Sequence, residues 1–229
     1  MNPAESLNPA NLEERTLGEI AVSLPGATTL FRTAGLDYCC GCQMRLKDAA
    51  AANSLNLGRI IDDLRDLRQE NALTPADLAT KPLIETIVTR YHRTHSRELP
   101  ELIQLAERVE MVHKGHASAP AGLASLLTRM LGELTTHMQK EELILFPHMN
   151  TDEGGAAFQH SIAAMMSEHQ EHGLHLEEIK RLTNDLRVPD DGCATWRALY
   201  SGLAKFIDDL MEHIHIENNI LFPRFLTDD

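Results

Sequence analysis

The sequence predicts an all-α protein, with an up-down-up-down four-helix bundle preceded by a small helical N-terminal domain. Aromatic residues make up 4% of the 229 residues, while Leu, Ala, Glu and Met are abundant. This composition favours helices, because unbranched side chains lose little rotamer freedom there. Turn signals are sparse beyond Pro82, and the segments between them carry apolar stripes with helical spacing. We therefore expect four long helices after Pro82.

The N-terminal domain is expected to cover residues 1–75. Its helices are predicted in short pieces: Thr16, as an N-cap, to Ser23, Pro25 to Ala34 before Gly35, and stretches around Lys47 and residues 57–69. A polar stretch from Gln69 to Pro82 then breaks the pattern. The bundle domain is expected to cover residues 82–229.

Turn signals divide the bundle domain at three places: His113–Pro120, Asn150–Gly155 and Val188–Gly192. Two of the resulting helices, residues 120–147 and 193–223, each carry one inward-facing line of side chains. The first line is Leu123, Leu127, Met130, Leu134, His137, Glu141 and Ile144; the second is Trp196, Leu199, Leu203, Phe206, Leu210, His213, Glu217 and Ile220. In both lines one His and one Glu interrupt an otherwise apolar stripe.

The same motif occurs twice in the bundle domain. His137-x-x-x-Glu141-x-x-Ile-Leu-Phe-Pro reappears 76 residues later as His213-x-x-x-Glu217-x-x-Ile-Leu-Phe-Pro. In the preceding helices, His92-x-x-His95 and His169-x-x-His172 are 77 residues apart. We infer that the domain consists of two copies of one helical hairpin.

A His and a Glu four residues apart share one face of a helix and can reach one metal ion or two adjacent ions. A surface ion pair is the alternative, but a carboxylate on an apolar stripe needs a cation to offset its desolvation. Residues at equal depth in an antiparallel hairpin lie symmetrically about its turn, and the three midpoints fall at or beside Gly115, Gly154 and Gly192. The bundle therefore brings six side chains to one level: His92, His137, Glu141, His169, His213 and Glu217.

Four imidazoles and two carboxylates exceed the ligands of one tetrahedral zinc and suit two bridged ions with open positions. Iron is the expected metal, with manganese as the alternative. The ferritin-like motif places the carboxylate three residues before the imidazole. Here the imidazole comes first, at a spacing of four.

These six residues resemble the di-iron ligands of hemerythrin-like domains. Together with the N-terminal motif Asp37-Tyr38-Cys39-Cys40-Gly41, nearly the whole chain resembles the iron–sulfur cluster repair (RIC) proteins, which are induced by nitrosative and oxidative stress. The resemblance implies two iron ions, two bridging glutamates, and Cys39 and Cys40 as the reactive vicinal cysteines. Cys42 stands where the family usually has a second glycine.

Other polar residues have weaker assignments. The spacing alone would also allow His95 and His172 as ligands, whereas the resemblance favours His92 and His169. Glu133 and Glu168 could support the ligands or lie on an exposed helix surface. The remaining histidines are expected to be solvated or hydrogen-bonded: His113, His116, His148, His160, His175 and His215. Cys39, Cys40 and Cys42 could be buried inert thiols, a strained and reducible disulfide, or thiolates that capture iron or NO; structural zinc has only three clustered ligands.

The charge pattern limits the partners of the protein. Its formal net charge is −13, and no basic run exceeds two residues, so we expect binding to neither nucleic acid nor a membrane. No apolar stretch approaches the roughly 20 residues of a membrane-spanning helix. Three of the four cysteines lie within four residues of one another, unlike a secreted disulfide framework, so a cytoplasmic location is expected.

Three functions remain open from the sequence. The resemblance implies a binding protein that donates iron to damaged iron–sulfur proteins, and we expect this rather than an enzyme. The alternatives are reduction of NO or O2 at open metal positions and reversible gas sensing at the di-iron site. A homodimer is left open.

Overall fold

The computed structural model describes residues 9–67, 74–151 and 156–226. In these ranges the regular structure is helical, apart from an isolated antiparallel bridge between Thr16 and Arg45. The described residues form two compact units: 9–67, 74–79 and 214–224 in the first, and 80–151, 156–213 and 225–226 in the second. The predicted all-α class is confirmed.

The N-terminal unit is built from short helices. They are η1 (Pro9–Glu14), α1 (Leu17–Ser23), α2 (Ala27–Thr33), α3 (Leu46–Ala52), α4 (Leu57–Asp66) and η3 (Pro75–Asp77). Thr16 caps α1 as predicted, because its Oγ1 accepts the N–H of Glu19 while the Glu19 carboxylate accepts the N–H of Thr16. Ile20, Phe31 and Leu46 are among the side chains that form its core.

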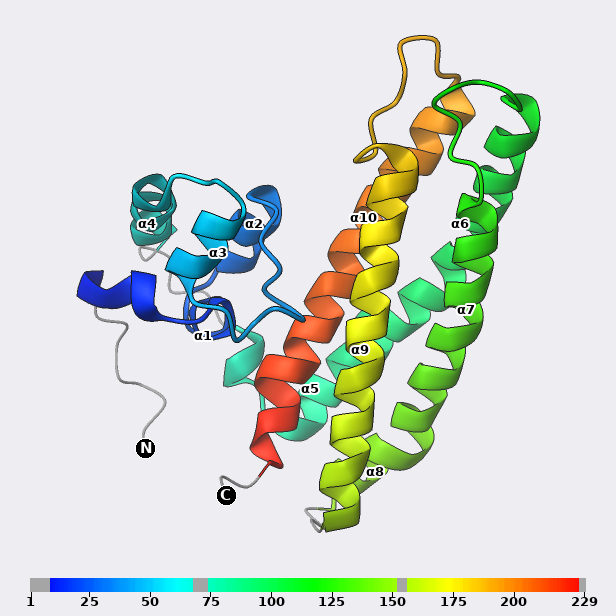
Figure 1. Cartoon of the computed structure of the whole chain (residues 1–229). Coiled ribbons are helices and arrows are strands. Elements are labelled where there is room, and N and C mark those ends of the chain that lie inside the picture. Colours follow the sequence, from blue (N-terminus) through cyan, green and yellow to red (C-terminus); the bar gives the residue numbers. More distant parts are fainter. Residues whose placement is uncertain (1–8, 68–73, 152–155, 227–229) are drawn as a thin grey trace. The chain divides into compact units, whose positions relative to one another are not determined.

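The second unit contains the four long helices that the sequence predicts (Figure 1). Its elements are α5 (Thr80–Thr86), η4 (Ile87–His92), α6 (Arg93–Val112), α7 (Leu123–Lys140), η5 (Glu141–Leu145), α8 (Phe146–Met149), α9 (Ala156–Thr183) and α10 (Ala194–Ile216) as far as His213. The last residues of α10, with η6 (Glu217–Leu221) and η7 (Phe222–Arg224), belong to the first unit. Helix α7 packs against both α6 and α9, and an ion pair between Lys205 and Glu98 joins α10 to α6. No helix in the described part of the chain is long and apolar enough to cross a bilayer.

Glycines mark the predicted turns. Gly115 lies between α6 and α7 with a φ of 92°, a conformation that side chains with a Cβ rarely adopt. Gly192 lies before α10, where an added Cβ would come within 2.5 Å of Val188 Cγ1. The third predicted position, Gly154, lies outside the described residues.

Three segments of the long helices are π-helical: η4, η5 and η6. Each contains one predicted ligand, at His92, Glu141 and Glu217. A π turn inserts an extra residue, which shifts the side chains that follow it around the helix. Ile144, predicted to face inward, is therefore 56% exposed, and Leu145 is buried instead. The prediction for Ile144 was wrong because it assumed α-helical spacing throughout.

Candidate metal centre

Five of the six predicted ligands come together inside the second unit. His92 ends η4, His137 lies on α7, Glu141 begins η5, His169 lies on α9 and His213 lies on α10. All five are at most 1% exposed. They form two groups that share Glu141: His92 and His213 on one side, and His137 and His169 on the other.

Glu141 lies between the two histidine pairs. Its Oε2 is 3.4 Å from Nε2 of His92, and its Oε1 is 3.4 Å from Nε2 of His137. Within the pairs, the Nε2 atoms are 3.1 Å apart for His92 and His213 and 3.0 Å apart for His137 and His169. Each carboxylate oxygen therefore faces its own pair of imidazoles, as in a carboxylate that bridges two ions.

This donor set fits metal ions. Neither oxygen of the buried Glu141 has a hydrogen-bond donor among the described residues, and a buried carboxylate without a compensating partner is costly. Two imidazole nitrogens bound at about 2.1 Å to one ion, at right angles, lie about 3 Å apart. The observed separations within both pairs match that value.

Two glutamates outside these groups orient the imidazoles. Nδ1 of His92 is 2.9 Å from Oε1 of Glu142, and Nδ1 of His137 is 2.9 Å from Oε2 of Glu168. Partial burial alone would raise the pKa of Glu168, but hydrogen bonds from Lys140 and His137 lower it. A proton held on Nδ1 leaves the Nε2 lone pair directed inward, which is the state that binds metal.

Glu168 was predicted either to support a ligand or to lie on an exposed helix surface. Its contact with His137, a candidate ligand, matches the first alternative. Glu142 was missed by the sequence reasoning. Its position next to Glu141 was the available signal, but in an α-helix adjacent residues point in different directions. The π turn that begins at Glu141 changes this spacing.

Glu217, the sixth predicted ligand, is fully buried in η6. This segment belongs to the compact unit that contains the N-terminal helices. The neighbouring residue, Asn218, donates a hydrogen bond from Nδ2 to the backbone oxygen of Cys39 at 3.3 Å. The second His-x-x-x-Glu motif therefore ends in a segment that contacts the cysteine loop.

Asp37 organises the cysteine loop. Its Oδ1 accepts the N–H groups of Cys39 and Cys40 at 3.2 and 2.9 Å, and its Oδ2 accepts that of Gly41 at 2.9 Å. A Cβ at Gly41 would lie 3.0 Å from the backbone oxygen of Asp37. Glycine therefore lets the chain wrap closely around this carboxylate.

The thiols of this loop differ in exposure. All four cysteines of the chain are thiols, and Cys39 and Cys42 are buried whereas Cys40 is partly exposed. A hydrogen bond with Cys40, together with burial, raises the pKa of Cys39 well above its usual value. Burial likewise raises the pKa of Cys42. Protonated, buried thiols are weak nucleophiles, so Cys40 is the more accessible member of the vicinal pair.

Five histidines outside the metal centre lie at the surface or contact other polar groups. His148 contacts the backbone oxygen of Ile144, His215 contacts Asn219, and His160 is exposed, as expected for hydrogen-bonded or solvated residues. His113 contacts the thiol of Cys193, which lowers the pKa of Cys193 to about 7. His116 lies beside Asp191.

His95 and His172 are buried, and none of their ring nitrogens has a hydrogen-bond partner in the described ranges. Burial, followed by neighbouring histidines, lowers both pKa values, that of His172 to about 2. Both imidazoles therefore stay neutral.

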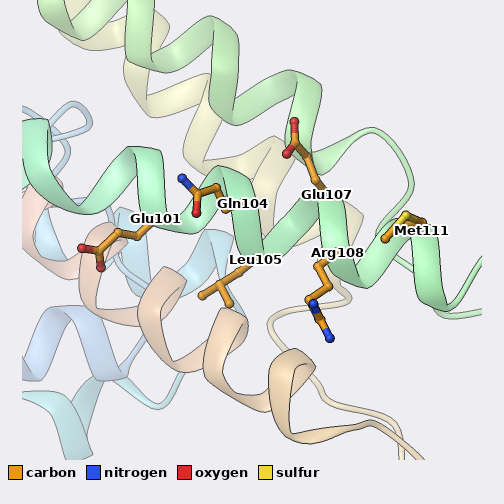
Figure 2. A pocket seen from close by; sticks show the side chains of 6 residues that line it. All are labelled: Glu101, Gln104, Leu105, Glu107, Arg108 and Met111. Carbon is orange, nitrogen blue, oxygen red and sulfur yellow. The ribbon is translucent and has the colours of Figure 1, made fainter.

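A surface pocket on α6 contains none of the candidate metal ligands (Figure 2). It is lined by Glu101, Gln104, Leu105, Glu107, Arg108 and Met111. In Figure 2 the carboxylates of Glu101 and Glu107 point away from the guanidinium of Arg108. These charged groups do not converge on one point, so we assign the pocket no role.

Comparison with known proteins identifies both parts of the chain. Residues 83–225 match the hemerythrin HHE cation-binding domain, and residues 13–68 match a domain of unknown function, DUF542. The chain is 46% identical over 221 residues to a probable iron-sulfur cluster repair protein of Haemophilus influenzae, covering 94% of this chain and 98% of that protein.

Two further relatives are named iron-sulfur cluster repair protein YtfE. The protein from Dickeya chrysanthemi is 46% identical over 93% of this chain and 97% of its own length. The protein from Escherichia coli O81 is 45% identical, with the same coverage of both chains. The chain therefore belongs to the iron–sulfur cluster repair family, and its bundle is a cation-binding hemerythrin domain.

Proposed function

We propose that this protein repairs iron–sulfur clusters damaged by nitrosative or oxidative stress, by donating iron from a di-iron centre. The observation that carries the proposal is the position of Glu141 between two histidine pairs, with one carboxylate oxygen towards each. The names of the relatives, which are iron-sulfur cluster repair proteins, supply the purpose. Damaged iron–sulfur proteins are the partners that this function requires.

The ligand set of the proposed centre is His92, His137, Glu141, His169, His213 and Glu217. Glu217 enters this set through the repeated motif, because it follows His213 by four residues as Glu141 follows His137. Four neutral imidazoles and two carboxylates carry a total charge of −2, and nitrogen and oxygen donors of this kind suit iron with open coordination positions. The two domains are assigned as residues 1–75 and 82–229.

Donation is the chemistry that this donor set favours. Imidazole and carboxylate ligands hold iron less strongly than the sulfide and thiolate ligands of a cluster attract it, so transfer towards sulfur is favourable. Glu142 and Glu168 keep the imidazoles in the tautomer that binds metal. Cys40, the more accessible thiol, is assigned as the group that receives iron in transit, and Asp37 fixes the loop that presents it.

Transfer of labelled iron tests the proposed function. The protein is loaded with ⁵⁷Fe and mixed with a [4Fe–4S] dehydratase whose cluster has lost one iron, in the presence of a chelator that captures free iron. We expect ⁵⁷Fe to enter the restored cluster, whereas ⁵⁷Fe salt added with the same chelator restores nothing. Restoration without ⁵⁷Fe in the cluster, or catalytic consumption of NO without restoration, would contradict the proposal.

A further inference from the structure

A second cluster of potential metal ligands lies between α7 and α9. Glu133 on α7 and His172 and His175 on α9 each offer one ligand atom, and these atoms lie within 4.8 Å of one another. Nδ1 of His175 is 3.3 Å from Oε2 of Glu133. Two imidazoles and one carboxylate are the ligand set that holds mononuclear non-haem iron and leaves positions open.

Helix geometry explains why these three residues meet. Glu133 precedes His137 by four residues on α7, and His172 and His175 follow His169 by three and six residues on α9. Because α7 and α9 are antiparallel neighbours, stepping back from His137 and forward from His169 leads in the same direction along the bundle. The ring centres of His172 and His137 are 5.2 Å apart. The cluster therefore lies about one helical turn from the candidate metal centre.

The burial of His172 indicates a ligand. His172 is 3% exposed, and neither of its ring nitrogens has a hydrogen-bond partner among the residues described. Nδ1 of His175 is buried as well, with Oε2 of Glu133 at 3.3 Å. Nearly all buried polar groups in native proteins have a partner, so the two ring nitrogens of His172 require an explanation. A metal ion would satisfy them.

The carboxylate of Glu133 provides access for an ion. Its side chain is 41% exposed, so an ion can reach the cluster from solvent. The nearby guanidinium of Arg129 lies 3.9 Å from Oε1, whereas Oε2 faces His175. The carboxylate therefore keeps one oxygen for an ion shared with the imidazoles.

We propose that Glu133, His172 and His175 form a mononuclear site for a third divalent transition-metal ion, separate from the di-iron centre. Ligand atoms bound at about 2.1 Å to one ion lie about 3 to 4 Å apart, which the cluster reaches with small side-chain adjustments. Co²⁺ and Zn²⁺ fit this donor set as well as Fe²⁺. The proposal depends on these three residues and not on the repair function.

Co²⁺ titration of the full-length, iron-loaded protein tests this site. After desalting, bound Co²⁺ is measured by equilibrium dialysis and by its visible absorption, and iron is measured in the same samples. We expect one Co²⁺ per chain at low concentration. In His172→Leu and His175→Leu the affinity should fall at least tenfold while the iron content is unchanged. His160→Leu, an exposed histidine on the same helix, is the matched control and should bind Co²⁺ as the wild type does.

The outcomes separate this site from the di-iron centre. If the wild type takes up no Co²⁺, or if both leucine variants bind it as the wild type does, the proposal is wrong and Glu133 and His175 form only an ion pair. If the buried His172→Leu variant also loses iron, His175→Leu and Glu133→Gln decide, because both side chains reach the surface. If the wild type binds Co²⁺ as expected but transfers no ⁵⁷Fe to a damaged cluster, the proposed repair function is wrong and the proposal of a third metal site stands.

Discussion

Glu141→Ala is expected to lose both iron ions, with an affinity reduced by more than roughly a hundredfold. The fully buried carboxylate has one oxygen 3.4 Å from each histidine pair, so its removal affects both ions at once. Groups that only orient a ligand typically cost about 10 to 100-fold in metal affinity when removed. Glu142→Ala and Glu168→Ala are the matched controls and should stay within that smaller range.

Iron content after dialysis against a series of chelator concentrations measures this difference. Circular dichroism is recorded for each variant, because a shortened side chain in the core also leaves a cavity. Glu141→Gln keeps the volume and removes the charge, and it should fall between the alanine variant and the wild type. Equal iron retention by Glu141→Ala and Glu142→Ala would refute the assignment of Glu141 as the bridging ligand.

Cys39→Ser/Cys40→Ser is expected to keep both iron ions and their spectrum while cluster repair falls several-fold or more. The two thiols belong to the N-terminal unit, whereas five of the six predicted ligands lie in the second unit. Asn218, next to the sixth ligand Glu217, contacts the backbone oxygen of Cys39 and not its thiol. A thiolate is a soft ligand for iron in transit, whereas a serine hydroxyl is a poor one. The serine hydroxyl can donate to Oδ1 of Asp37 as the thiol of Cys39 does. The backbone N–H groups of residues 39 and 40, which also donate to Asp37, are unchanged, so the turn should be preserved.

Cys42 requires its own control because it stands two residues after Cys40. The triple serine variant is therefore compared with the double variant, and cluster recovery in the acceptor is measured alongside iron content. Full recovery with the triple variant would show that iron leaves the bundle without these thiols. The cysteine loop would then be a structural turn of the N-terminal unit.

The fold and the convergence of the histidine pairs follow from periodicity. The apolar stripes predicted the long helices, and the symmetry of His92, His137, His169 and His213 about the turns placed them at one level, where the structure has them. Such predictions succeed because helical spacing and short loops leave few alternative arrangements.

Features that depend on departures from regular spacing could not be predicted. The π turn at Glu141 exposes Ile144 and accompanies the contact between Glu142 and His92. His175 was expected to be solvated or hydrogen-bonded, but the sequence did not identify Glu133 as its neighbour. The contact of Asn218 with Cys39 joins residues 179 positions apart. No local pattern in the sequence encodes such tertiary contacts.

The central claim is that His92, His137, Glu141, His169, His213 and Glu217 hold a bridged pair of iron ions. Mössbauer spectroscopy of the ⁵⁷Fe-loaded, oxidised and desalted protein tests it most directly, with iron and zinc counted in the same sample. We predict two irons per chain with the spectrum of a magnetically coupled diferric pair. One zinc per chain, or only the spectrum of isolated ferric ions, would contradict the claim.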